Sequence, residues 1–203
     1  MGYLSTDQPP RGEICVNTSS LMEGYFKNPE KTKEAIPDGI WLHSGDVGII
    51  HPDGVIQIID RAKNIFKLSQ GEYISPEKIE NVVIQSPWIA QAWIYGNSFQ
   101  DFCVLVAVVE PNTVATKFGK CDESVLRDPT LLTLIHKDIK ALADSKNLSS
   151  LERPKHFHLT LDPFSVENEL LTPTQKLKRN IAKLTFKAEV DALYKEGPFK
   201  PLP

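Results

Sequence analysis

The sequence has few cysteines and no long apolar run. Its 203 residues include three cysteines, Cys15, Cys103 and Cys121, which are widely spaced and form no C-x-x-C pair. Such a set gives neither a disulfide framework nor a zinc site and favours a reducing compartment. The longest apolar stretch, Phe102 to Val109, is too short to span a bilayer, and the first dozen residues lack the layout of a secretory signal. The sequence therefore predicts a protein that is not secreted and has no membrane anchor in this segment.

No sign of charge dominates either. The chain has 23 basic and 26 acidic side chains, so its net charge of -3 gives no reason to expect nucleic-acid binding. The sequence contains no Walker A loop, no G-x-G-x-x-G after a strand, no G-x-S-x-G elbow and no H-E-x-x-H. If this chain handles a nucleotide, the main phosphate-binding loop lies outside it. The hydrophobic fraction of 41% excludes disorder and fits one sizeable domain, or a small domain with part of another.

The first 59 residues have a β-rich pattern. A strand is expected over Glu13–Val16, and a turn at Asn28-Pro29 is expected to lead into a short helical segment through Ala35. The Asp53-Gly54 pair lies between two runs of β-forming residues, which predicts a hairpin. This part is too short and irregular to close a core alone, so we expect it to belong to something larger.

The pattern changes at the charged cluster Asp60–Lys63 to mixed α and β. Phe102–Val109 is apolar throughout, which predicts a strand buried on both faces. The other expected elements are a short strand over Ile65–Leu68, a helix from Ser75 to about Gln85, a strand over Ile89–Tyr95, a helix starting at Asp128-Pro129, a strand around His156–Thr160 and a last helix over about Asn180–Tyr194. The expected fold class is α+β.

Two histidines share one face of the strand predicted around Phe157. His156 and His158 alternate with Phe157 and Leu159, which predicts that the histidines lie on the solvent side. Metal ligation by the two imidazoles is the alternative.

Four charged residues are candidates for a site. Asp46, in the tight turn His43–Asp46, offers two oxygens that could accept both hydroxyls of a ribose, or it could satisfy its own turn. Arg61 and Lys63 could contact phosphate or ribose, or form surface ion pairs. Lys176 follows a loop fixed by threonines and a proline. It could bring a positive charge to a phosphate in a transition state, or belong to a solvated basic face.

Read in order, several segments together resemble the adenylate-forming superfamily of acyl-CoA synthetases, luciferases and adenylation domains. The segments are Arg11–Val16 with Gly24–Phe26 and Pro29–Thr32, then Gly39–Gly48 (GIWLHSGDVG), Ile59–Lys67 (IDRAKNIFK) through Gly71–Glu80 (GEYISPEKIE), and Leu171–Lys176 (LTPTQK). The third segment, with Phe164–Asn168 before the last, is most similar to eukaryotic-type long-chain fatty-acid–CoA ligases.

The resemblance implies that residues 1–59 are the β-rich end of the large AMP-binding domain. Residues 60–203 would be the small, mobile C-terminal domain, with a short hairpin followed by a three-stranded type of sheet flanked by helices. In such enzymes ATP and a fatty acid form an acyl-adenylate, and the CoA thiol then displaces AMP. The small domain rotates between these half-reactions about a hinge.

Site residues follow from the resemblance by position. Asp46 matches the acid that holds the ribose hydroxyls, Arg61 matches the arginine near the ribose, and Lys63 matches the hinge. Lys176 matches the lysine of adenylation. It follows Gln175, which stands where many relatives have glycine.

The second half-reaction has its own candidates. Lys67 matches a lysine that some members use for thioester formation, and Gly71 matches a glycine that the CoA arm passes. The resemblance also implies that the Mg²⁺ ligands, the phosphate loop and the fatty-acid tunnel lie upstream. The chain would then be a C-terminal fragment that is inactive alone, with no metal site of its own. Its partner would be the N-terminal domain of the same protein.

Two alternatives stay open beside this hypothesis. One is a noncatalytic module that keeps the fold for binding or regulation, and the other is an adenylate-forming enzyme with a different acid or acceptor. For the parent protein, the expected location is the cytoplasm or the cytoplasmic face of an organelle membrane.

Overall fold

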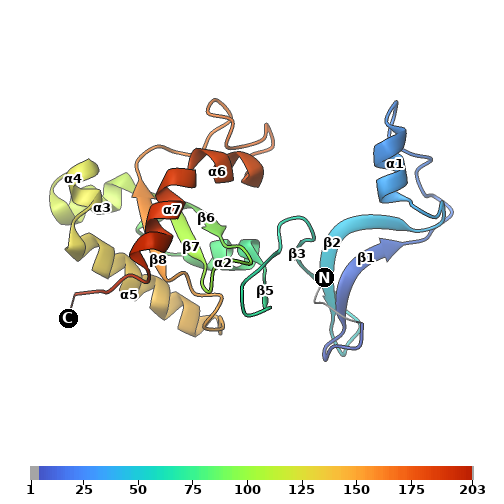
Figure 1. Cartoon of the computed structure of the whole chain (residues 1–203), viewed down its shortest axis with the longest axis horizontal. Helices are drawn as coiled ribbons and strands as arrows, with labels where there is room; N and C mark the ends of the chain where they lie inside the picture. Colours follow the sequence, from blue (N-terminus) through green and yellow to red (C-terminus); the bar gives the residue numbers. More distant parts are fainter. Residues whose placement is uncertain (1–4, 203) are drawn as a thin grey trace. The chain divides into compact units, whose positions relative to one another are not determined.

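The computed structural model describes residues 5–202, which form two compact units that divide between Ile65 and Phe66. The elements of the first unit are β1 (Arg11–Val16), α1 (Pro29–Ala35), β2 (Leu42–Ile50) and β3 (Ile56–Arg61). Those of the second are β4 (Phe66–Lys67), β5 (Tyr73–Ile74), α2 (Pro76–Val83), β6 (Ile89–Tyr95), β7 (Val104–Val109), α3 (Pro111–Phe118), α4 (Glu123–Leu126), α5 (Pro129–Ser145), β8 (His156–Thr160), α6 (Arg179–Thr185) and α7 (Lys187–Glu196) (Figure 1). The predicted α+β class is confirmed.

The first unit is an antiparallel sheet with the order β1-β2-β3. The hairpin predicted at Asp53-Gly54 joins β2 and β3. The His51 N–H donates to the Val55 carbonyl across 2.9 Å, and Gly54 has a φ of +84°, a conformation that favours glycine. Helix α1 begins as Asn28 and Pro29 predict, because the Asn28 side chain accepts the Lys31 N–H at 3.0 Å.

This first unit buries few apolar side chains. Of its described residues, only Ile36 and Val47 belong to the buried apolar set. Many large apolar side chains are exposed instead: Val16, Tyr25, Phe26, Ile40, Trp41, Ile50, Val55, Ile56 and Ile58. An isolated domain rarely leaves so much apolar surface in water.

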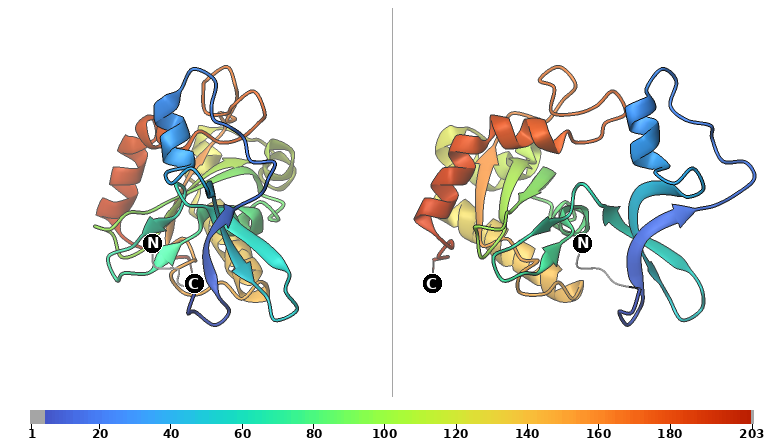
Figure 2. Two further views of the ribbon diagram at one scale, coloured as in Figure 1. Left: turned by 90° about the vertical axis from the view of Figure 1, so that its right-hand side faces the viewer. Right: turned by 45° about the vertical axis from the view of Figure 1, so that its right-hand side comes forward.

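The second unit is built on a three-stranded sheet with the order β6-β7-β8. Strand β7 pairs with β6 antiparallel and with β8 parallel. A parallel pair requires a crossover connection, and α3, α4 and α5 provide it. The views in Figures 1 and 2 show α6 and α7 on one face of the sheet and α5 on the other.

Strand β7 is buried on both faces, as its continuous apolar run predicts. Leu105, Ala107 and Val109 pack into the cluster that includes the apolar side of α5. The alternate residues Val104, Val106 and Val108 pack into a second cluster with Ala182, Val190 and Leu193 of α6 and α7. Burial of Cys103, next to this strand, raises the pKa of its thiol to about 12, so it behaves as a small apolar side chain.

The last predicted helix is interrupted. The pattern predicts one helix over 180–194, whereas α6 ends at Thr185 and α7 begins at Lys187. Between them Phe186, with φ -98° and ψ 22°, leaves helical geometry. The Phe186 ring is nearly buried, and its centre lies 6.0 Å from that of Trp93 and 5.7 Å from that of Phe164. The interruption of the helix therefore coincides with a residue that packs into the core.

The prediction that His156 and His158 lie on the solvent side is wrong. Helix α7 covers that face of β8, so both histidines are partly buried. The His158 ring lies 6.5 Å from the Phe186 ring, and His156 Nε2 lies 3.1 Å from a Glu196 carboxylate oxygen. The alternation along β8 identified two faces correctly but could not show that a later helix covers the second.

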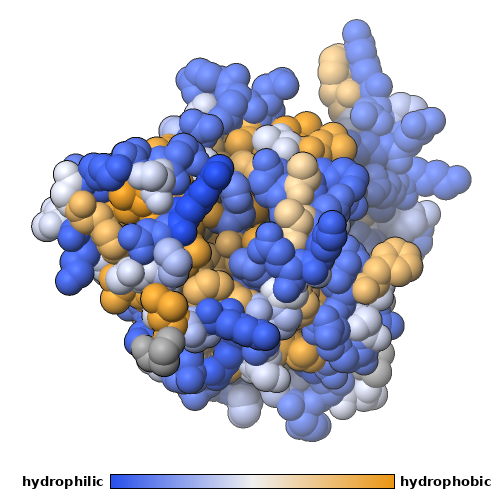
Figure 3. Space-filling model, turned by 60° about the vertical axis from the view of Figure 1, so that its left-hand side comes forward, coloured by the Kyte–Doolittle hydropathy of each residue, from blue (hydrophilic) through white to orange (hydrophobic). Residues whose placement is uncertain are grey.

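On the face of the molecule drawn in Figure 3, apolar atoms form separate patches between polar and charged ones. No helix in the described part of the chain combines the length and the apolar character needed to cross a membrane.

The environment of His158 predicts a pH dependence of stability. Desolvation lowers the pKa of His158, with Glu189 and Glu123 opposing this shift and Arg127 adding to it. The unfolded chain therefore binds more protons than the folded chain, and stability is lost as the pH falls below about 6.5. We expect the urea midpoint to fall less between about pH 7.5 and about pH 5.5 in His158→Gln than in the parent chain.

A control keeps this prediction specific. His51→Gln, on the β2–β3 hairpin, should keep the full pH dependence of the parent chain. If His158→Gln also keeps that dependence, the protonation of His158 does not destabilise the fold.

Candidate functional site

Asp46 and Arg61 lie opposite each other on β2 and β3. They are paired in the strand register, and the Arg61 Nε lies 3.0 Å from Asp46 Oδ1. Arg61 also donates from Nη2 to the Ser44 carbonyl at 3.2 Å. The two side chains are 59% and 33% exposed, so both the guanidinium and the carboxylate remain accessible to a ligand.

The turn before Asp46 is held by other side chains. The Ser44 hydroxyl accepts the Asp46 N–H at 3.0 Å, and the Glu13 carboxylate accepts the Gly45 N–H at 3.1 Å. Gly45 has a φ of +74°, and a Cβ there would lie 3.5 Å from Arg61 Nη2. These contacts oppose the alternative that Asp46 serves its own turn, because its carboxylate is directed to Arg61 instead.

Glu13 also contacts His43, and with Cys15 these side chains form a group. Glu13 Oε2 lies 3.0 Å from His43 Nδ1, and Cys15 Sγ lies 3.8 Å from the same nitrogen. The three donor atoms lie within 4.8 Å of one another, and within residues 5–202 this is the one such group that could hold a metal ion. Burial and the charges of Glu13 and Asp38 raise the pKa of the Cys15 thiol, which disfavours the thiolate that a metal needs. The Glu13–His43 contact explains the group without a metal.

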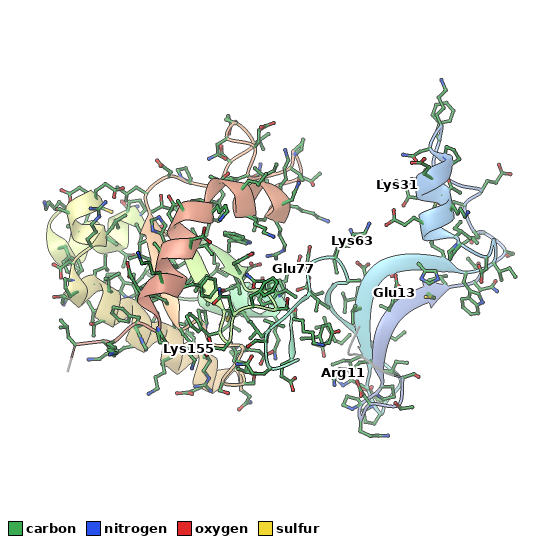
Figure 4. The ribbon with its side chains drawn as sticks, in the orientation of Figure 1. Arg11, Glu13, Lys31, Lys63, Glu77 and Lys155 are labelled. Atoms are coloured by element: carbon green, nitrogen blue, oxygen red, sulfur yellow. The ribbon has the colours of Figure 1, made fainter. Side chains whose placement is uncertain are left out.

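Lys63 lies on the loop after β3 (Figure 4). Its Nζ is 2.6 Å from Glu34 Oε1, and this hydrogen bond lowers the pKa of the Glu34 carboxyl. Because the two side chains are 82% and 62% exposed, the pair is expected to contribute little to stability. In this structure Lys63 therefore forms a surface ion pair, which was the alternative to a contact with phosphate or ribose.

Lys67 and Gly71 meet in the β4–β5 hairpin. Lys67 pairs with Tyr73, and its Nζ lies 5.4 Å from the centre of the Tyr73 ring. Gly71 has a φ of +93°, and a Cβ there would lie 3.8 Å from Lys67 Cε. This turn therefore favours glycine for its backbone conformation as well as for the approach of a ligand.

The hairpin is fixed to the sheet at both its base and its tip. Phe66 packs so closely over Gly96 that a Cβ at Gly96 would lie 2.4 Å from the ring. At the tip, the Ser69 N–H donates to the Gln100 carbonyl at 2.9 Å, and Gln70 Nε2 donates to the Asp101 carbonyl at 2.7 Å.

Lys176 ends a tight turn in the segment before α6. The Gln175 N–H donates to the Thr172 carbonyl, and the Thr172 N–H donates to the Lys176 carbonyl, both at 2.8 Å. The Thr172 hydroxyl accepts the Lys176 N–H at 3.0 Å. Gln175 has a φ of +60°, a left-handed conformation, which explains why glycine suits this position. The Lys176 side chain is exposed, and within residues 5–202 no ion-pair partner is found for it.

Arg179, just after this turn, forms a buried ion pair that the sequence analysis missed. Its Nη1 and Nη2 donate to the two carboxylate oxygens of Glu80, at 2.7 Å and 2.6 Å. Glu80 Oε1 also accepts the Ile94 N–H at 2.8 Å, and Glu77 Oε1 lies 3.9 Å from Arg179. Glu77, labelled in Figure 4, and Glu80 both belong to α2. In the sequence, Glu80 stands out only as the last acid of the segment Gly71–Glu80. Its partner is 99 residues away along the chain, so the sequence gives no sign of the pair.

Three hollows in the described part of the chain, of about 260, 450 and 240 Å³, are lined by residues other than Asp46, Arg61, Lys67 and Lys176. Within the first unit Asp46 and Arg61 are brought together, and within the second unit Lys67 and Gly71 are. Lys67 and Lys176 lie on separate hairpins of the same unit.

A family model described as the AMP-binding enzyme C-terminal domain matches residues 63–197. The chain belongs to this family. The chain is similar to the protein named as the peroxisomal long chain acyl-CoA synthetase 6 of Arabidopsis thaliana, which is 43% identical over 97% of this chain. The long-chain-fatty-acid–CoA ligase 5 of Rattus norvegicus is 40% identical over 96% of this chain. The chain spans 29% of the length of each of these two relatives.

Solved structures agree with the AMP-binding enzyme assignment. The adenylation domain of a carboxylic acid reductase from Segniliparus rugosus, solved with AMP and a carboxylic acid, has a TM-score of 0.84 at 32% identity, over 96% of this chain and 30% of its own. The corresponding domain from Mycobacterium chelonae has a TM-score of 0.86 at 32% identity, over 96% of this chain and 29% of its own. The resemblance to adenylate-forming enzymes is thus confirmed.

The left-handed residue in the turn of Lys176 gives a prediction. We expect Gln175→Gly to change the free energy of unfolding by less than about 1 kcal/mol, because glycine adopts positive φ without steric cost. Gln175→Val should lower it by about 1–2 kcal/mol, because a side chain branched at Cβ clashes in this conformation. Urea unfolding of the two variants measures the difference. Equal stability of both would show that the turn does not impose a left-handed residue 175.

Proposed function

We propose that this chain is the C-terminal part of a long-chain fatty-acid–CoA ligase. The observation that carries the proposal is the identity of about 40% over nearly the whole chain to proteins named as long-chain acyl-CoA synthetases. The order of the motifs and the geometry of the two lysine hairpins support it. The complete protein would use ATP and CoA to activate a fatty acid.

The reaction has two steps. A fatty-acid carboxylate oxygen attacks the α-phosphorus of ATP, the bond to the β-phosphate oxygen breaks, and pyrophosphate leaves with that electron pair. The CoA sulfur, having lost its proton, then attacks the acyl carbonyl, and AMP leaves. Each step concentrates negative charge at the reacting phosphate or at the carbonyl oxygen, where a well-placed ammonium lowers the barrier.

We assign residues 1–59 to the end of the AMP-binding domain and residues 60–203 to the mobile C-terminal domain. The exposed apolar side chains of the first unit support this, because a larger domain would cover them. The exposed Lys63–Glu34 pair is compatible with a hinge at Lys63, since an exposed ion pair of this kind would restrain rotation only weakly.

Asp46 would hold the ribose hydroxyls of ATP, with Arg61 beside it. A carboxylate has two acceptor oxygens and can take both hydroxyls, and the Arg61 Nε, 3.0 Å from Oδ1, orients it. The residues that bind the phosphates, Mg²⁺ and the acyl chain would lie in the rest of the protein.

Lys176 would stabilise the transition state of adenylation, and Lys67 would act in thioester formation near Gly71 and the CoA arm. The positions of the two lysines support the use of Lys176 in one half-reaction and of Lys67 in the other. Because they lie on separate hairpins of one unit, each would reach a shared reaction centre in a different orientation of that unit.

The partners are therefore small molecules: a fatty acid, ATP and CoA. We place the complete protein in the cytoplasm or on the cytoplasmic face of an organelle membrane, and its N-terminal domain is the chain's partner. Two relatives, the long chain acyl-CoA synthetases 6 and 7 of Arabidopsis thaliana, are named as peroxisomal.

A second candidate is an adenylate-forming enzyme with a different acceptor. The structural match to carboxylic acid reductase adenylation domains, one of them solved with a carrier-protein domain, favours this alternative. The ligase is preferred because identity to the acyl-CoA synthetases is higher, at 40–43% against 32%.

Substitution of the two lysines in the complete protein tests the proposal. Lys176→Ala should slow acyl-adenylate formation by about 100-fold or more, because a charge that acts in the transition state is lost. Lys67→Ala should instead slow the conversion of supplied palmitoyl-AMP and CoA to palmitoyl-CoA. Rapid-quench measurement of the two half-reactions separates the effects.

Lys137→Ala, on the surface of α5, serves as the control and should change neither step. Unchanged adenylation in Lys176→Ala would refute the catalytic assignment and favour a noncatalytic module. Adenylate formation without any thioester product from fatty acids and CoA would favour the different acceptor.

A further inference from the structure

We propose that the Glu80–Arg179 pair is a positioning clamp that fixes the Lys176 turn and thereby supports adenylation, but not thioester formation. The inference rests on the proposed function of Lys176 and adds two residues to it. Neither residue is suggested to touch the substrate.

The pair is built as a rigid attachment. Two parallel hydrogen bonds of 2.7 and 2.6 Å join the guanidinium to the carboxylate, and such forked pairs fix both distance and angle. Their side chains are only 18% and 12% exposed, so water competes weakly for them. Glu80 is also fixed from a third direction by the Ile94 N–H of β6 at 2.8 Å. The first residue of α6 is therefore attached to both α2 and the central sheet.

The other end of the turn is attached through its backbone and apolar side chains. The Leu171 N–H donates to the Ser165 carbonyl, and the Lys178 N–H donates to the Leu170 carbonyl, both at 2.8 Å. Leu170 and Leu171 are buried in the cluster under α6 and α7. Leu170 and Leu171 hold the start of the segment, and the Lys178 hydrogen bond together with Arg179 holds its end, so the backbone of residues 172–178 is held at both ends.

The Lys176 side chain has no attachment of its own. It is exposed, and among the residues described here no carboxylate pairs with it. Its reach is therefore set by the turn, and the position of the turn depends on Arg179. A displacement of about 1 Å at a reacting centre can cost on the order of 100-fold in rate.

The Lys67 hairpin is held by different contacts. Phe66 packs on Gly96, and the tip donates to the carbonyls of Gln100 and Asp101. None of these contacts uses Glu80 or Arg179. A weakened clamp should therefore move Lys176 and leave Lys67 in place, which separates a positioning role from a general loss of stability.

Arg179→Lys in the complete protein is the test, with Glu80→Gln as the second variant. Lysine keeps the charge but loses the forked geometry, and glutamine keeps the acceptor for Ile94 but loses the charge. Both variants should slow adenylation by about 10- to 100-fold and change thioester formation from supplied palmitoyl-AMP by less than about threefold. Hydrogen exchange should rise at residues 172–178 and stay unchanged in β7.

Arg153→Lys is the matched control. Arg153 pairs with Asp144 and donates to the Leu148 carbonyl in the same unit, away from the turn. This variant should leave the ratio of the two half-reaction rates at the wild-type value even if its midpoint of unfolding falls.

The outcomes separate the two proposals. If the wild-type protein is active and Arg179→Lys slows both half-reactions equally, or slows neither, the clamp proposal is overturned while the proposed function stands. If Arg179→Lys fails to fold, the same decision falls to Glu80→Gln and to the exchange rates of 172–178 in that variant. A wild-type protein that forms no acyl-adenylate overturns the proposed function, and the clamp with it.

Discussion

One carboxylate, that of Glu80, joins three parts of the family-matched unit. It accepts hydrogen bonds from the β6 backbone and from both terminal nitrogens of Arg179, while it projects from α2. A nearly buried charge is tolerated only when its partners satisfy it, so these elements must keep their relative positions for the unit to be stable. The turn that carries Lys176 is restrained in the same way, because Arg179 follows it directly in the chain.

The two units of the chain contrast in how they are stabilised. The unit from Phe66 onward has a strand buried on both faces and two apolar clusters, so it can move as a rigid body. The first unit has a sheet with few buried side chains, and its Asp46–Arg61 pair depends on local contacts from Ser44 and Glu13. A rigid lysine-bearing unit and a sheet that presents the Asp46–Arg61 pair would suit the two-step reaction with domain rotation that we propose.

Much of this fold could be predicted because its signals are local. Proline and asparagine or serine predicted where α1 and α2 begin, and the unbroken apolar run predicted that β7 is central. The sequence could not predict the cover over His158, the break at Phe186 or the Glu80–Arg179 pair. Each of these depends on residues far apart in the chain that only packing brings together.

For the candidate site, the order of the motifs predicts Asp46, Arg61, Lys67 and Lys176, and these assignments stay predictions. The structure adds the contacts around them, such as the Asp46–Arg61 pair and the turn that carries Lys176. Gln175 shows the difference well, because its mismatch with the glycine of relatives was visible in sequence, while its positive φ explains it. The residues that hold the turns are Glu13, inside the segment Arg11–Val16, and Arg179, just after Lys176. Neither of them has a role that the sequence predicts, and their contacts in the structure supply one.

The central claim is that Lys176 approaches the reacting acyl phosphate from a turn that moves with a rigid unit. The most direct test is a structure of the complete protein bound to a stable acyl-adenylate analogue. The account predicts that the Lys176 ammonium lies within hydrogen-bond distance of the carboxyl or phosphate oxygens, with the Glu80–Arg179 pair intact. A closed complex in which Lys176 remains in solvent and another cation occupies that place would contradict it.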